Sequence, residues 1–253
     1  MTAPRPPDTP RAELVERLHG RVVADPYRWL EDGHSFDVKA WTTTQQSHTE
    51  LVLATIPGRG VLAEQIAHLL RAGTALTCAV AGALVFSLER WGHHDQAALV
   101  VRSVEDPDTA RVLVDPHAAT RDPTAAIDWY EPSPDGRRIA YGLSRGGDER
   151  STLHVLDVDS GEHLSDHIPN TRACSVAWLP DASAFAYTRY PDPATVADHD
   201  RGYWRTVWWH TVGEPPGNDR LVWGDLPDKA VWPNVSISRD GRWLLVHIAL
   251  GWR

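Results

Sequence analysis

Cysteine is scarce in this sequence, and no site built from cysteines is expected. Cys78 and Cys174 are the only two cysteines among 253 residues, and they lie 96 positions apart. Because no Cys-x-x-Cys pair is present, neither a zinc site nor a disulfide framework is suggested. A reducing compartment fits this usage best, and we expect a cytoplasmic protein.

Long apolar runs and clustered positive charge are missing as well. The N-terminus has no apolar core of a signal peptide, and no window approaches the ~18 consecutive apolar residues of a membrane span. The chain carries 25 Lys and Arg against 34 Asp and Glu, and its formal net charge is −9. Without a basic run it has no means of neutralising a phosphate backbone. We therefore expect neither a membrane nor a nucleic acid as a partner.

What the sequence has in quantity is apolar and aromatic side chains, 42% hydrophobic residues with 12 tryptophans, enough for a buried core. The first 72 residues predict an α-helical segment. Residues 1–10 carry four prolines and are expected to form an extended, poorly ordered arm. Ser35 is the expected N-cap of a helix that reaches Thr55, and a second helix is predicted over 60–72. The apolar side of the first helix should hold Phe36, Val38, Trp41, Leu51 and Val52.

Residues 73–253 repeat a strand pattern. PDGRRIAYG, PDASAFAYT and RDGRWLLVH each place a turn with an aspartate before a strand, and the turn residues are Asp135, Asp181 and Asp240. The steps are 46 and 59 residues, and a weaker copy lies at 81–90. Each step has room for about four strands, which is typical of a β-propeller blade. We predict a mainly β fold with a partial β-propeller of about three and a half four-stranded blades after the helical segment.

A possible nucleophile lies in YGLSRGGD, at 141–148, which contains Gly-x-Ser-x-Gly. A nucleophile elbow joins a strand to a helix, because that sharp turn exposes the serine hydroxyl. Here the strand pattern before Ser144 is good, but the residues after Gly147 predict a second strand. Ser144 is therefore expected in a hairpin between two blade strands, as a false elbow, and no catalytic residue is assigned.

Other candidate binding residues give weaker signals. The 13 histidines contain no H-E-x-x-H and no ligand spacing, so neither a metal site nor a cofactor is expected. Arg150, Arg172 and Arg189 suit carboxylate binding near a propeller mouth and equally suit pairing with surface acids. Seven tryptophans after residue 203 form either a stacking surface or, as we favour, packing between blades.

The run DPYRWLED at 25–32, preceded by LHGRVV at 18–23, resembles the N-terminal signature of the prolyl oligopeptidase family of serine peptidases. Further family-like segments follow in order along essentially the whole chain. They are Trp41 with Gln45 and Gln46, IPGR at 56–59, Gln96 before AALVVR, VLVDP at 112–116, SPDGRRIAYGLSRGGDE at 133–149, VAWLPD at 176–181 and YTRYP at 187–191.

The resemblance implies an α/β-hydrolase domain capped by a seven-bladed propeller, with the N-terminal helical segment packed on the hydrolase domain. The family's catalytic serine, aspartate and histidine belong to a C-terminal portion, so no position of this chain takes them. By resemblance, the propeller restricts entry to short peptides, which the family cleaves after proline. NTRACSVAW at 170–178 is similar to a substrate-lining segment, and Arg172 and Ala173 are its candidate substrate-facing residues. Some relatives have a bulky aromatic side chain at the position of Ala173.

Two classes of function remain open. In the first, the chain is the N-terminal portion of a prolyl-specific endopeptidase and supplies the lid over a peptide substrate. In the second, it is a non-catalytic propeller fragment that binds peptides or proteins, or an inactive truncated product. Because three and a half blades do not close a ring, the chain by itself is expected to aggregate, to oligomerise or to need a partner.

Overall fold

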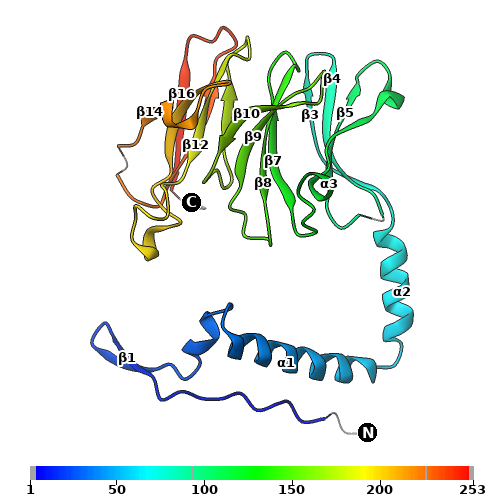
Figure 1. Cartoon of the computed structure of the whole chain (residues 1–253), viewed down its shortest axis with the longest axis vertical. Helices are drawn as coiled ribbons and strands as arrows, with labels where there is room; N and C mark the ends of the chain where they lie inside the picture. Colours follow the sequence, from blue (N-terminus) through cyan, green and yellow to red (C-terminus); the bar gives the residue numbers. More distant parts are fainter. Residues whose placement is uncertain (1–3, 93, 226, 251–253) are drawn as a thin grey trace. The chain divides into compact units, whose positions relative to one another are not determined.

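The computed structural model describes residues 4–92, 94–225 and 227–250 (Figure 1). The chain divides between Leu70 and Arg71 into two compact units. The first unit is helical with one small hairpin, and the second is built almost entirely of β-sheet. In the described residues, no helix has the length and apolar character needed to cross a bilayer.

The N-terminal unit contains a hairpin and two helices, as the sequence predicts for its helical part. Ser35 caps the first helix, because its Oγ accepts a hydrogen bond from the Val38 backbone N–H at 3.2 Å. The second helix begins one residue before the predicted range and ends two residues before the predicted end. The elements are β1 (Val15–Leu18), β2 (Arg21–Ala24), the 3-10 turn η1 (Arg28–Glu31), α1 (Phe36–Ala54) and α2 (Arg59–Leu70).

The proline-rich arm is held in place, so the expectation of poor order is wrong for its described part. The indole N–H of Trp29 donates to the Pro10 carbonyl at 3.1 Å, and that of Trp41 donates to Thr9 Oγ1 at 3.1 Å. Gln45 donates to the Pro7 carbonyl at 3.3 Å. Proline lacks an N–H but keeps its carbonyl, so donors on α1 and η1 anchor the arm.

Most apolar side chains of the N-terminal unit remain exposed. Val38 is the one hydrophobic residue in its described part that is fully buried. Phe36 is 84% exposed and Leu51 is 65% exposed, although both belong to the predicted apolar side of α1. Within this unit, the face that the sequence assigns to a core has little to pack against.

The second unit consists of four antiparallel sheets that stand side by side in chain order (Figure 1). Three have four strands and the last has two, which confirms three and a half blades.

Blade 1 is β3 (Thr74–Ala81), β4 (Leu84–Arg90), β5 (Ala98–Ser103) and β6 (Arg111–Val114); blade 2 is β7 (Ala126–Pro132), β8 (Arg138–Ser144), β9 (Thr152–Asp157) and β10 (His163–Ile168). Blade 3 is β11 (Val176–Trp178), β12 (Ala184–Arg189), β13 (Thr206–Thr211) and β14 (Arg220–Trp223); the described part of blade 4 is β15 (Val231–Ile237) and β16 (Leu244–Leu250). Short helical turns in the connections are η2 (Pro107–Thr109), α3 (Pro116–Thr120), η3 (Asp198–Asp200) and η4 (Pro216–Asn218).

The repeated turn joins the first and second strands of its blade and uses the same chemistry each time. Ser133 Oγ donates to Asp135 Oδ1 at 2.7 Å, and Ser238 Oγ donates to Asp240 Oδ1 at 2.6 Å. Asp181 accepts in the same way from the serine two residues later, at 2.7 Å. The carboxylates hold the tight turns closed, which explains why an aspartate marks each predicted copy. The residues that follow them have positive φ: Gly136 (75°), Ala182 (58°) and Gly241 (72°).

Apolar residues fill the seams between neighbouring blades. Seam 1–2, between blades 1 and 2, buries Phe86 and Leu99 against Ile139 and Leu156. In seam 3–4, Trp209 and Trp223 pack beside Val207 and Val235, as expected for tryptophans between blades. Other late tryptophans differ: Trp243 is 65% exposed, and Trp252 lies outside the described residues.

Seam 2–3 has an apolar part around Leu153 and Phe185 and, beside it, a buried ionic cluster. His210 Nε2 lies 2.7 Å from Asp166 Oδ1, and His210 Nδ1 lies 2.6 Å from Asp219 Oδ1. The imidazole is completely buried and so is nearly all of both carboxylates. Tyr187 donates its hydroxyl proton to the second oxygen of Asp219 at 2.5 Å.

Both ring nitrogens of His210 face a carboxylate, so both carry a proton and the ring is an imidazolium. Burial opposes this charge, but the hydrogen bonds that His210 donates to Asp166 and Asp219, together with the attraction of the two carboxylates, outweigh burial and raise the pKa of His210 to about 9. For Asp166, burial acts to raise the pKa, but the hydrogen bonds from His210 and from the Gly213 backbone N–H, together with the charge of His210, outweigh burial and lower the pKa. Asp166 belongs to blade 2 and the other two residues to blade 3, so a charged clamp joins the blades.

Candidate substrate-facing site

The candidate site residues lie in loops at one end of blades 2 and 3. The loop 145–151 joins β8 to β9, the linker 169–175 joins β10 to β11, and the loop 190–205 joins β12 to β13. Backbone hydrogen bonds tie them together, from Thr171 N to the Ser151 carbonyl and from Tyr190 N to the Asn170 carbonyl. The three segments therefore form one continuous surface, here called the loop cluster.

Ser144 is the last residue of β8, and the chain turns back into β9, which pairs with β8. Its side chain is buried, and Oγ donates to Asp128 Oδ1 at 2.9 Å. The second oxygen of Asp128 accepts a hydrogen bond from Ser151 at the other end of the loop. Asp128 thus fastens both ends of the 145–151 loop to β7, and this hairpin lacks the strand-to-helix turn of an elbow.

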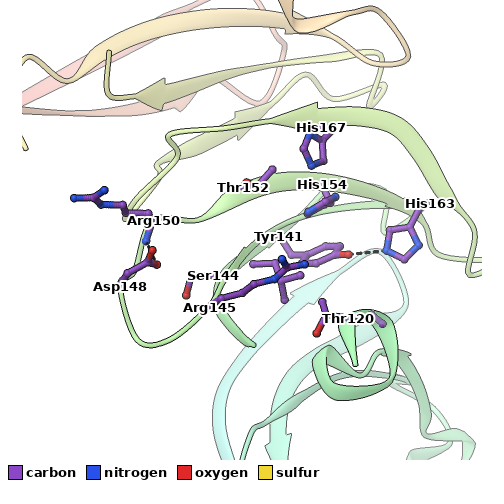
Figure 2. A pocket seen from close by; sticks show the side chains of 12 residues that line it. Thr120, Tyr141, Ser144, Arg145, Asp148, Arg150, Thr152, His154, His163 and His167 are labelled. Atoms are coloured by element: carbon purple, nitrogen blue, oxygen red, sulfur yellow. Dashed lines mark hydrogen bonds between the residues drawn. The ribbon is translucent and has the colours of Figure 1, made fainter. Parts of the chain in front are cut away.

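Beside Ser144 lies a pocket of about 550 Å³, lined by histidines that the sequence reasoning missed (Figure 2). Tyr141, His154 and His167 stand opposite one another on β8, β9 and β10. The rings of Tyr141 and His154 stack with centroids 5.4 Å apart, and His163 Nε2 lies 2.6 Å from the Tyr141 hydroxyl (Figure 2). The register of β9 and β10 shifts between His163 and His167, so the spacing of this hairpin in the sequence would not have paired His154 with His167.

Burial keeps Tyr141, His154 and His163 uncharged at neutral pH. Burial lowers the pKa of His154 to about 4, with a further contribution from the neighbouring His167 and His163. Burial also lowers the pKa of His163 and raises that of Tyr141. These three side chains therefore offer neutral hydrogen-bonding groups in a pocket whose lining also includes Arg145, Asp148 and Arg150. Across residues 4–92, 94–225 and 227–250, no three His, Cys, Asp or Glu side chains are arranged to bind a metal ion.

The two predicted substrate-facing residues are adjacent and exposed in the linker 169–175. The Arg172 guanidinium donates to Glu149 Oε2 at 2.7 Å, and both side chains are more than half exposed. Ala173 has a positive φ of 44°. A second pocket of the loop cluster is lined by Arg150, Arg172 and Arg201.

The sequence comparisons cover nearly the whole chain. Residues 7–253 match the family described as prolyl oligopeptidase, N-terminal beta-propeller domain. Prolyl endopeptidase of Elizabethkingia miricola is 24% identical over 249 residues, which cover 96% of this chain and 34% of the relative. Prolyl oligopeptidase A of Galerina marginata is 29% identical over 266 residues, which cover 91% of this chain and 35% of the relative. The chain spans about a third of the length of these curated relatives.

Solved structures agree with the sequence match. A structure from a structural and mechanistic study of two prolyl endopeptidases has a TM-score of 0.85 and 32% identity, over 97% of this chain and 36% of that one. Prolyl oligopeptidase B from Galerina marginata, solved with a 35mer substrate, has a TM-score of 0.76 and 23% identity, over 96% of this chain and 37% of that one, and shows the fold. With its blades, its signature segment and a match over residues 7–253, the chain belongs to the N-terminal β-propeller family of the prolyl oligopeptidases.

Proposed function

We propose that this chain is the N-terminal portion of a prolyl oligopeptidase-like serine endopeptidase that cleaves short peptides after proline in the cytoplasm. In this proposal residues 1–72 pack on an α/β-hydrolase domain that carries the catalytic serine, aspartate and histidine. Residues 73–253 form part of the propeller that filters substrates. The family match over residues 7–253 is the observation that carries the proposal.

The exposed apolar surfaces of the N-terminal unit support the packing role. Val61, Leu62 and Leu69 on α2 are 62%, 57% and 71% exposed, which is an unusual amount of apolar surface for a helix without a partner. Burial against another domain would return about 25 cal/mol for each Å² removed from water. Both helices of this unit therefore suit a role as a covering layer.

Two blade faces support a larger propeller. On β3, Leu76 is 57% exposed and Val80 is 66% exposed; on β16, Ile248 and Leu250 are 53% and 55% exposed. Faces of this kind are buried between blades elsewhere in the same unit. Further blades packed on them would remove both the apolar faces and the open sheet edge.

For the loop cluster we propose that Arg172 and Ala173 face the substrate and that Ser144 has a structural role only. Arg172 and Ala173 are exposed on one surface, whereas Ser144 is buried and bonded to Asp128. The small side chain of Ala173 leaves more room at this position than an aromatic residue would. We therefore expect weaker apolar contact with the substrate there than in relatives with an aromatic residue.

The test is the native product of source cells, captured with an antibody against residues 1–72. We expect a polypeptide about three times the 28.1 kDa of this chain, since the chain spans a third of its relatives. The captured protein should react with a fluorophosphonate serine probe and cleave a fluorogenic peptide after proline but not after alanine. A product of 28.1 kDa that fails both assays would contradict the peptidase proposal and favour a non-catalytic propeller that binds peptides or proteins.

A further inference from the structure

Three arginines of the loop cluster and its borders have no carboxylate within ion-pair distance among the described residues: Arg150, Arg189 and Arg205. In a chain with 34 acidic and 25 basic residues, an acid is available for every guanidinium. Other arginines of the described chain also lack a carboxylate within this distance, but at the loop cluster several of them lie together and give a local excess of positive charge. Two of them, Arg150 and Arg189, are among the arginines that the sequence singles out.

Arg205 is buried almost completely, with 1% of its surface exposed. Its Nη2 donates to Thr188 Oγ1 at 2.6 Å, and its guanidinium lies 5.2 Å from the centre of the Trp232 ring. Nε and Nη1 are buried and have no hydrogen-bond partner among the described residues. Thr188 pairs with Val207 across the sheet, so Arg205 lies on the face of β12 and β13 that is directed toward blade 4, opposite to the face that carries Arg189 and Trp208.

Arg189 lies at the surface, next to Thr188 in β12. Its guanidinium stacks on the ring of Trp208, 3.7 Å from the centroid. Stacking fixes the plane of the guanidinium and leaves its N–H edge free to donate two parallel hydrogen bonds. It lines a pocket of about 500 Å³ together with Trp204 and Thr206, the residues on either side of Arg205.

Arg150 lines the neighbouring pocket with Arg172 and Arg201. The two pockets share Asn170, Tyr190 and Pro191, so they form one continuous depression, here called the arginine groove. Arg172 and Arg201 pair with Glu149 and Asp198 in exposed contacts, which are worth little and exchange readily. The one carboxylate that lines the groove is Asp192, whose Oδ1 accepts from the Ala194 N–H at 2.9 Å.

We propose that the arginine groove binds the carboxylate of a peptide. The free N–H edge of Arg189 would hold the carboxylate, Arg150 would add a second guanidinium from the neighbouring pocket, and the rings of Trp204 and Tyr190 would contact the adjoining residue. A carboxylate suits this geometry because guanidinium donors match its two oxygens. The chemistry is the same for a C-terminal carboxylate and for an aspartate or glutamate side chain. The inference rests on the proposed function only in taking the ligand to be a peptide.

Binding of short proline-free fluorescent peptides to the full chain, followed by anisotropy, tests this without any cleavage. The probes are a peptide with a free C-terminus and no acidic residue, its C-terminal amide, and the amide with one glutamine replaced by glutamate. We expect Arg150→Gln and Arg189→Gln each to weaken binding of carboxylate-bearing probes roughly fivefold to tenfold, and Arg189→Lys to restore part of the loss. Arg137→Gln, at the opposite end of β8, is the matched control.

The amide without glutamate should bind most weakly, and the stronger of the other two probes identifies the source of the carboxylate. Higher salt should weaken only the carboxylate-dependent part. Equal binding of all three probes, no binding of any, or an equal effect of Arg137→Gln would overturn the proposal, provided that circular dichroism shows each variant folded. Carboxylate-dependent binding by a protein that cleaves no prolyl peptide would uphold this inference while the proposed function fails.

Discussion

Seam 1–2 and seam 2–3 join the same blade to its two neighbours by different physical means. Seam 1–2 is held by apolar packing around Phe86, Ile139 and Leu156. Seam 2–3 adds the clamp of Asp166, His210 and Asp219, buried in the same protein interior. Apolar packing tolerates small shifts between surfaces, whereas hydrogen-bonded charges require one alignment. The clamp therefore fixes the position of blade 3 on blade 2 and makes that contact depend on pH.

The strongest test of this difference removes one charge of the clamp. Asp166→Asn should lower the free energy of unfolding by about 3 kcal/mol, because His210 keeps its buried charge with a single carboxylate. The control is Asp159→Asn, an exposed carboxylate of the same blade, which should change stability by less than about 0.5 kcal/mol. Urea titration of the intact protein measures both. Equal effects of the two substitutions would show that the buried clamp contributes no more to stability than an exposed carboxylate.

Raising the pH should weaken seam 2–3 and leave seam 1–2 unchanged. The folded-state pKa of His210 is raised to about 9, so its contribution is complete below the unfolded pKa of ~6.5 and is lost as the pH rises through 9. We expect a loss of roughly 2–3 kcal/mol over this range. Leu156→Ala, in seam 1–2, should cost about 3 kcal/mol at every pH. A wild-type stability that stays flat up to pH 9 would contradict the imidazolium assignment.

The histidine pocket of blade 2 should respond to pH in the opposite direction, so that lowering the pH decreases the stability. His154 has a pKa lowered to about 4, so the unfolded chain takes up its proton first as the pH falls below ~6.5. Stability should therefore decrease by about 1–2 kcal/mol between pH 6.5 and 4, after correction for the titration of carboxylates. His154→Phe should remove this part of the decrease. The same acid slope in the variant would mean that His154 is not the group responsible.

The smallest expected effect belongs to Ser144, at the edge of the same pocket. Ser144→Ala removes the hydrogen bond to Asp128 and should cost about 1 kcal/mol, as should its matched partner Ser151→Ala. The proposed peptidase activity should be unchanged in both variants. A complete loss of activity in Ser144→Ala alone, with folding intact, would make Ser144 a nucleophile.

Local features of the fold could be predicted from the sequence because neighbours in the chain create them. In the turns at Asp135, Asp181 and Asp240, each aspartate accepts a hydrogen bond from a serine two residues away. Both partners therefore belong to the short motif that the sequence shows. The N-cap at Ser35 is equally local. The blade count followed from these turns, and the likeness to the family came from ordered short segments.

Long-range contacts could not be predicted from the sequence, because residues far apart in the chain create them. Asp166 and His210 are 44 residues apart, and only the stacking of two blades brings them together. The proline arm was expected to be poorly ordered, because its anchors, Trp29 and Trp41, lie beyond it in the sequence. Periodicity assigned Phe36 to a buried face, but it cannot say whether the surface that covers this face belongs to the same unit.

Each sheet of the second unit pairs its strands in consecutive order, without a crossover. Such a sheet needs no later part of the chain to complete its hydrogen bonds, and its contacts are short in sequence. During synthesis, a blade can therefore form as soon as its fourth strand has left the ribosome. Asp166 of blade 2 is synthesised 44 residues before His210, so this carboxylate has no imidazolium partner until His210 has been made. The ionic contact of seam 2–3 can therefore form only after blade 2 is complete and most of blade 3 has been synthesised.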